Sequence, residues 1–161
     1  MEAGTLSSVG RTNTPGRQNR EARQQPIEEV TVAYLDAHLD ADLAVTLEAD
    51  RPGTLAKAIE CVSRAGINID GYAEIGGVVH VLSPELRTAH ACLEQAGFRI
   101  VQEHRVVVVP VADQPGAAAG VFKTLADAHI NIKYSYLATR NRLVIAVGDT
   151  EKALAALTDN V

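Results

Sequence analysis

The sequence predicts an α+β fold made of two βαββαβ units, the second of which lacks its last strand. The first observation behind this prediction is a motif, Asp-x-Pro-Gly followed by Ile-Asn-Ile, which occupies 50–69 and recurs 63 positions later at 113–132. Eight of the twenty aligned positions are identical. The second observation is that alternating apolar segments and turn residues follow each motif, as expected for hairpins. Both observations indicate the duplication of one small module.

The first unit begins with alternating apolar residues at 43–47, which predict a strand. A turn then opens a helix at 54–65, whose apolar positions recur at helical spacing. Gly66 supplies the helix end and Gly76-Gly77 a two-residue hairpin turn between strands 67–75 and 78–82.

Ser83 is the expected N-cap of a second helix, with Pro84 at the first helical position and Gly97 after its end. A fourth strand follows at 98–103. The order places both helices on one face of an antiparallel sheet, which is the ferredoxin-like arrangement.

The second unit repeats this order, and its strand 143–147 leads into a last helix that Asp149 caps. The repeat then lacks its fourth strand, so one edge of the strand 106–111 should be uncovered. Pro110 agrees with an edge position. We expect that edge to be covered by segment 27–36, by the other unit's fourth strand or by another chain.

The predicted organisation is a mostly disordered tail at 1–40, a first unit at 41–104 and a second unit at 105–161. The net charge of −5 combines +2 in residues 1–26 with −7 in the rest, and this acidic body argues against nucleic acid or a membrane surface as partner. Cys61 and Cys92 lie in helical patterns without CxxC spacing, so we expect reduced core thiols in a cytoplasmic protein.

The turn before each first helix is a candidate ligand site. A helix N-terminus offers unpaired N–H groups and partial positive charge, and Gly53 and Gly116 allow a ligand close to that backbone. Such a turn suits a carboxylate. Asn68 and Asn131 can both donate and accept, but each lies at the far end of its own helix, about 18 Å away at 1.5 Å per residue. An asparagine could therefore meet only the turn of an opposed unit.

These motifs, together with Gly66-Ile67-Asn68-Ile69, resemble the ACT domain over roughly residues 41–158. The resemblance implies a ferredoxin-like regulatory module that binds an amino acid between two copies, without a catalytic domain. The second copy departs from the first in having His129 where Gly66 stands and Ala117-Ala118 in place of Thr54-Leu55. The ligand-binding residues implied are Asp50, Pro52, Gly53, Thr54, Leu55, Asn68, Ile69, Asp113, Pro115, Gly116, Ala117, Asn131 and Ile132.

Other interpretations remain open from the residues alone. Asp-x-Pro-Gly is also a good strand-to-helix turn in which Asp caps the helix, and the asparagines could simply satisfy backbone groups. The run Asp36, His38, Asp40 and Asp42 fits a solvated acidic linker better than a metal site. The scattered histidines show no spacing that signals a catalytic triad.

The function that we expect is a non-catalytic amino-acid sensor, a homodimer with a possible protein partner and with no cofactor or metal. The alternative is a ligand-independent dimerising subunit that docks an amino-acid biosynthesis enzyme.

Overall fold

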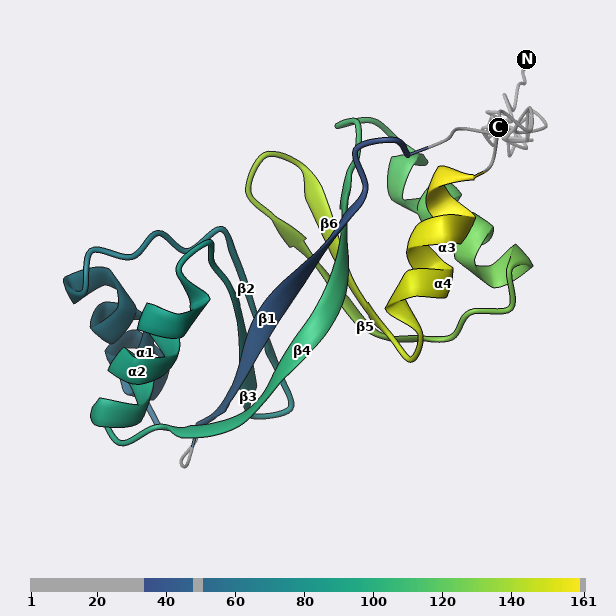
Figure 1. Ribbon diagram of the computed structural model, residues 1–161. Coiled ribbons are helices and arrows are strands. Elements are labelled where there is room, and N and C mark those ends of the chain that lie inside the picture. Colours follow the sequence, from purple (N-terminus) through teal and green to yellow (C-terminus); the bar gives the residue numbers. More distant parts are fainter. Residues whose placement is uncertain (1–33, 48–50, 160–161) are drawn as a thin grey trace, which may run out of the picture. The chain divides into compact units, whose positions relative to one another are not determined.

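A computed structural model describes residues 34–47 and 51–159 of the chain (Figure 1). Residues 1–33 of the tail expected at 1–40 lie outside the described residues, as do segment 27–33 and Asp50. The end of the expected tail was wrong, because residues 38–40 belong to β1. The elements, in chain order, are β1 (His38–Thr46), α1 (Thr54–Arg64), β2 (Gly71–Ile75), β3 (Val78–Leu82), α2 (Leu86–Gln95), β4 (Arg99–Pro110), α3 (Ala117–Asp127), β5 (Ile132–Ala138), β6 (Arg142–Val147) and α4 (Thr150–Thr158).

The strands form one antiparallel sheet in the order β2-β3-β1-β4-β6-β5. The expected fourth strand of the first unit and first strand of the second are one continuous strand, β4. The predicted boundary between residues 104 and 105 therefore falls inside a strand. Pairing of β4 with β1, with one register shift between Ala44 and Val45, joins the two halves into one sheet.

The edge of β4 that the sequence left uncovered is paired with the start of β1. His38 lies opposite Val108 and Asp40 opposite Val106. The strand at these positions is the start of β1, which begins five residues earlier than the apolar alternation at 43–47 suggests. Pro110 is the last residue of β4 and lies beyond this pairing.

Two helix-covered cores lie on the sheet, one under each helix pair (Figure 1). Under α1 and α2, Leu43 and Val45 of β1 pack against Val62 and Leu93. Under α3 and α4, the alternate residues Val107 and Val109 of β4 play the same part. The helical stripes predicted from the sequence therefore face the sheet.

A third core lies on the helix-free face and brings the two halves of the sheet together. Val106 and Val108 of β4 pack there with Leu82 of β3 and Tyr136 of β5. At its rim the Thr139 N–H donates to the Asp70 carbonyl at 2.8 Å. The terminal strands β2 and β5 thus approach each other and enclose this core.

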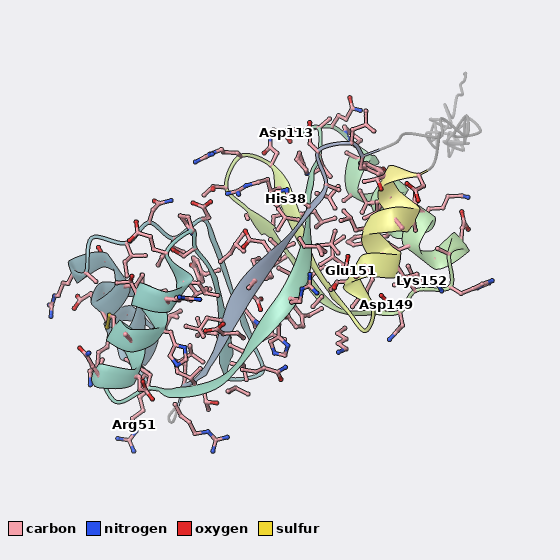
Figure 2. All side chains as sticks on the ribbon, viewed as in Figure 1. His38, Arg51, Asp113, Asp149, Glu151 and Lys152 are labelled. Atoms are coloured by element: carbon pink, nitrogen blue, oxygen red, sulfur yellow. A yellow bond between two sulfur atoms is a disulfide. The ribbon has the colours of Figure 1, made fainter. Side chains whose placement is uncertain are left out.

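Several local features confirm the sequence-based expectations. Gly66 and Gly97 have positive φ after their helices, and both residues of the Gly76-Gly77 turn do as well. Asp149 caps α4, accepting a hydrogen bond from the Lys152 N–H at 2.9 Å. Figure 2 shows both residues at the start of α4.

Other expectations were wrong. The second strand begins at Gly71 rather than at Ile67, and α2 begins at Leu86 with Glu85 as its N-cap. Ser83 instead holds two segments together: its hydroxyl donates to the Asn68 carbonyl at 2.8 Å and accepts from the Glu85 N–H at 3.2 Å.

The prediction of reduced cysteines was also wrong, because Cys61 and Cys92 form a disulfide between α1 and α2. Spacing in the sequence could not show this pairing, since the two residues meet only when the helices pack side by side.

Candidate functional site

The first Pro-Gly turn leaves the start of α1 open to solvent. Pro52 and Gly53 are exposed, and Gly53 has φ +93°, a left-handed conformation that L side chains rarely adopt. Since Gly53 is itself the N-cap, no side chain caps α1. The first turn of α1 also carries no acidic residue, so its partial positive charge is not offset locally.

A hollow of about 450 Å³ lies at this turn. Its two cationic side chains are Arg51, which Figure 2 labels, and Lys57, whose Nζ lies 5.8 Å from the centre of the Phe98 ring. The two cations and the helix start give this hollow a positive electrostatic character, which favours an anion. The lining residues, none of them acidic, are Arg51, Pro52, Gly53, Thr54, Lys57, Ala96, Gly97 and Phe98.

The second turn has nearly the same backbone. Gly116 has φ 91° and ψ −14°, against 93° and −14° for Gly53. Asp113 and Pro115 are exposed, and because Gly116 is the N-cap, Asp113 is not the capping residue of α3. The alternative in which this aspartate caps the helix therefore does not hold for the second copy.

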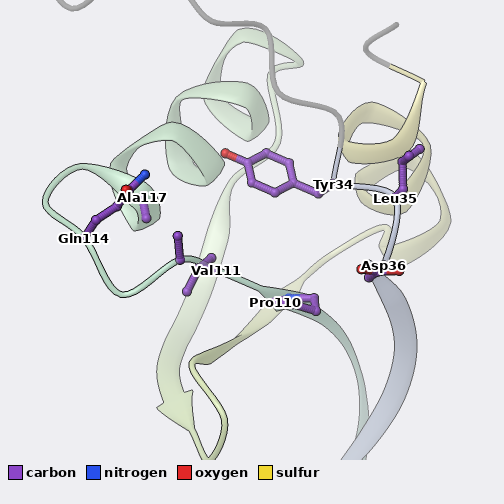
Figure 3. A pocket seen from close by; sticks show the side chains of 8 residues that line it. Tyr34, Leu35, Asp36, Pro110, Val111, Gln114 and Ala117 are labelled. Atoms are coloured by element: carbon purple, nitrogen blue, oxygen red, sulfur yellow. The ribbon is translucent and has the colours of Figure 1, made fainter.

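The hollow at the second turn, of about 370 Å³, differs in charge from the first (Figure 3). Gln114 takes the place of Arg51 and Gly120 that of Lys57. Its lining residues, which include one carboxylate and no cation, are Tyr34, Leu35, Asp36, Pro110, Val111, Ala112, Gln114 and Ala117. The two turns therefore have the same backbone conformation but different charge. Only the hollow at the first turn has cations that would attract an anion.

Tyr34 occupies in the second half the place that Phe98 occupies in the first. The Phe98 N–H donates to the carbonyl of Leu93 at the end of α2, and the Tyr34 N–H donates to that of Leu157 at the end of α4, both at 3.0 Å. Each aromatic residue precedes a strand that completes its half of the sheet. The start of β1, preceded by Tyr34, thus takes the place of the missing fourth strand of the second unit.

The two asparagines do not share a hollow with a Pro-Gly turn. The exposed Asn68 donates its amide N–H to the Asp70 carboxylate at 2.5 Å, which is a side-chain contact rather than the backbone contact of the alternative interpretation. Asn131 lines another hollow of about 360 Å³, which includes Lys133, Asp149 and Lys152. Within one chain, the structure therefore separates the turns from the asparagines.

The other predicted ligand residues lie in the cores or at the helix starts. Ile69 packs against the core under α1 and α2, and Ile132 against the core under α3 and α4. Leu55 and Ala117 are half-buried at the helix starts. His129, which replaces Gly66, adopts the same left-handed conformation, with φ +56° against +74°, so this departure preserves the backbone path.

A buried polar cluster lies on the helix-free face and was missed by the sequence analysis. Asp42, expected in a solvated linker, is fully buried. It accepts hydrogen bonds from the Tyr134 hydroxyl at 2.9 Å and the Tyr136 hydroxyl at 3.3 Å, and lies 3.2 Å from His80 Nδ1. Burial, followed by the charge of Asp42, raises the pKa of both tyrosine hydroxyls. The sequence signal that could have indicated this cluster is a histidine, His80, within an otherwise apolar strand.

A second polar contact joins the edges of the sheet. Arg142 donates to the Asp70 carboxylate at 2.8 Å, and both side chains are largely buried. This hydrogen bond holds the pKa of the Asp70 carboxyl below its usual range. Among the described residues, no group of three or more histidine, cysteine or acidic side chains could hold a metal ion, and no helix is long and apolar enough to cross a membrane.

Comparison with known proteins gives a fold and no family assignment. No protein-family model matches the chain, and no curated protein does either. Among solved structures, protein BT0572 from Bacteroides thetaiotaomicron is similar with a TM-score of 0.66 and 25% identity, over 76% of this chain and 89% of that one.

The regulatory subunit of aspartate kinase from Thermus thermophilus, in its ligand-free form, is similar with a TM-score of 0.59 and 20% identity, over 81% of this chain and 99% of that one. Escherichia coli aspartokinase III, in complex with aspartate and ADP, matches with a TM-score of 0.56 and 20% identity, over 80% of this chain and 34% of that one. The described part of the chain thus has an α+β fold seen in regulatory subunits of aspartate kinase.

Proposed function

We propose that this protein is a non-catalytic regulatory protein made of two ACT-type, ferredoxin-like units, and that it binds a small amino acid at the Gly53 turn. The observation that carries the proposal is the hollow at this turn, which combines an uncapped helix start with Arg51 and Lys57 and has no acidic lining residue. The ligand carboxylate binds the two cations and the N–H groups of the first turn of α1 that follow Thr54, whose own N–H donates to the Arg51 carbonyl at 3.1 Å. The fold similarity to regulatory subunits of aspartate kinase supports the regulatory role.

The same proposal includes a homodimer that completes the site. Gly53 and Asn131 line separate hollows of one chain. A second copy brings an asparagine to the turn, where its amide meets the ammonium or carboxylate of the ligand. Ligand binding then stabilises one arrangement of the dimer and changes affinity for a protein partner, with a coupling free energy of about 1–3 kcal/mol. We place this protein in the cytoplasm and give it no cofactor.

The test is a thermal-shift screen with each of the twenty amino acids, followed by titration of any that raises the melting temperature. Replacing Arg51→Gln and Lys57→Gln removes both cations, and glutamine already stands at the matching position 114. We expect about a tenfold weaker affinity, or about 1.4 kcal/mol. These changes are better than Gly53→Ala, which strains a left-handed backbone even without ligand.

Arg87→Gln is the matched control, because Arg87 is exposed on α2 and does not line the hollow. It should leave the titration unchanged. An unchanged affinity in the Arg51→Gln, Lys57→Gln double variant would show that the carboxylate binds elsewhere.

The alternative, a ligand-independent subunit that docks a biosynthetic enzyme, is favoured by the terminal strand β2. Its Tyr72 and Ile75 side chains are 53% and 42% exposed and are therefore available to a partner protein. A flat screen with all twenty amino acids, together with loss of binding to an aspartate kinase catalytic subunit in a Tyr72→Ser variant, would favour this function over the sensor.

A further inference from the structure

The disulfide joins the two helices whose ends form the Gly53 hollow. Cys61 lies on α1 and Cys92 on α2, with their Cα atoms 6.3 Å apart, and these are the two cysteines of the whole sequence. Gly53 and Thr54 at the start of α1 line one side of the hollow, and Ala96 to Phe98 after the end of α2 line the other. The bond therefore fixes the two sides of the hollow relative to each other.

Without this bond, α1 and α2 contact each other mainly through small or aliphatic residues. The buried positions are Ala58 and Val62 on α1 and Ala89 and Leu93 on α2. Such contacts are non-directional, and they permit small sliding movements of packed helices. Both cysteines are half-buried, so a reductant can approach the sulfur atoms from solvent.

The second half of the molecule lacks this connection. Thr124 on α3 stands 63 residues after Cys61, and Ala156 on α4 stands 64 after Cys92, the same offset that relates buried Leu93 to Leu157. The Gly116 turn therefore has the same backbone as the Gly53 turn, but no disulfide joins the two helices of its half. It is an internal control for any effect of the disulfide.

We propose that Cys61 and Cys92 form a reversible thiol–disulfide site that controls the Gly53 hollow. A dithiol reductant attacks one sulfur as its thiolate, forms a mixed disulfide, and its second thiol then releases the protein as two free thiols. The reductant loses two electrons and two protons, and the protein gains them. In a reducing compartment such disulfides are usually transient, which suits a sensing role. The consequence for ligand affinity rests on the proposed function, whereas the consequence for the hollow does not.

Hydrogen exchange on the full chain tests the coupling without any ligand. Oxidised protein and protein reduced with dithiothreitol are compared, with the thiol state measured by alkylation and mass spectrometry. On reduction, we expect backbone exchange at 51–57 and 96–98 to rise about threefold or more, with 114–120 unchanged. Thiols that stay free after oxidation, or equal exchange at 51–57 in both forms, would overturn the proposal.

Two variants separate this effect from general loosening. Cys61→Ser with Cys92→Ser should exchange like the reduced parent and ignore dithiothreitol. Adding Thr124→Cys and Ala156→Cys to that variant should move reductant sensitivity to 114–120, and sensitivity that stays at 51–57 would contradict the mechanism.

Ligand coupling is measured with an equimolar mixture of the twenty amino acids as probe. We expect a smaller increase in melting temperature for the reduced than for the oxidised chain, because the tied hollow is preorganised. No increase in either form would overturn the proposed function while leaving the exchange result to decide the switch. An equal increase in melting temperature in both forms would show that the disulfide does not change ligand affinity.

Discussion

At the scale of single residues, Asp42 shows how a charge is kept inside this protein. A buried carboxylate is stable only where donors replace its water shell. Tyr134, Tyr136 and His80 surround Asp42, and they come from β3 and β5, on opposite sides of β1 in the sheet. The cluster therefore connects the two halves through one side chain.

Tyr134→Phe should lower the free energy of unfolding by about 1–3 kcal/mol, because Asp42 loses its nearest donor. Tyr72→Phe, at a tyrosine that is 53% exposed, should change it by less than about 0.5 kcal/mol. Urea denaturation at pH 8 measures both. Equal effects of the two substitutions would mean that Asp42 does not depend on this hydroxyl.

The same tyrosines set a dependence on alkaline pH. Their folded-state pKa values are raised, whereas an unfolded tyrosine ionises near pH 10. Their stabilising contribution is therefore complete below about pH 10 and is lost as the pH rises above it, since only the unfolded chain releases these protons. Between pH 9 and 11 the free energy of unfolding should fall less steeply in Tyr134→Phe than in the parent.

At the scale of elements, β1 belongs to both halves. Its end carries Leu43 and Val45 into the core under α1 and α2, and Leu39 near its start packs against the core under α3 and α4. The start of β1 therefore serves as the fourth strand of the second half, just as the first part of β4 serves as the fourth strand of the first half.

Leu39→Ala tests this role of β1 and should cost about 1–2 kcal/mol, because a half-buried side chain leaves the second core. Leu35→Ala is the control, four residues earlier at a side chain that is 75% exposed, and should be near neutral. Urea denaturation compares the two variants. If Leu39→Ala did not change the free energy of unfolding, β1 would not contribute to the core under α3 and α4 through this side chain.

Elements with a strong local signal were predictable from the sequence. The apolar stripe located α1, the repeat of the motif located α3, and Asp149 and the Gly76-Gly77 turn were sufficient for a cap and a hairpin. The start of β1 was not, because Asp42 resembles a linker residue until its partners, 38 to 94 residues away, are known. The same holds for the site: the motif found Gly53, while Phe98 reaches the hollow only through packing of α2.

At the scale of the described fold, the two terminal strands of the sheet, β2 and β5, contact each other. Arg142 and Asp70 form an ion pair across this contact, and the absence of a side chain at Gly71 lets β2 lie against β5. The helix-free core and the Asp42 cluster are enclosed by this approach. The contact between β2 and β5 thus depends on having glycine at position 71.

Gly71→Ala should therefore destabilise the whole described fold. A Cβ at Gly71 would lie 2.7 Å from the Ala138 Cβ and 3.2 Å from both the Ala138 Cα and the Tyr136 ring, and overpacking of this kind costs about 1–3 kcal/mol. Gly148→Ala is the matched control, since a Cβ there meets nothing within 4 Å. Urea denaturation should show one cooperative transition shifted to lower urea for Gly71→Ala and an unshifted one for Gly148→Ala. An unshifted midpoint for Gly71→Ala would mean that β2 and β5 are not in close contact in solution, and the buried environment inferred for Tyr136 would fail with it.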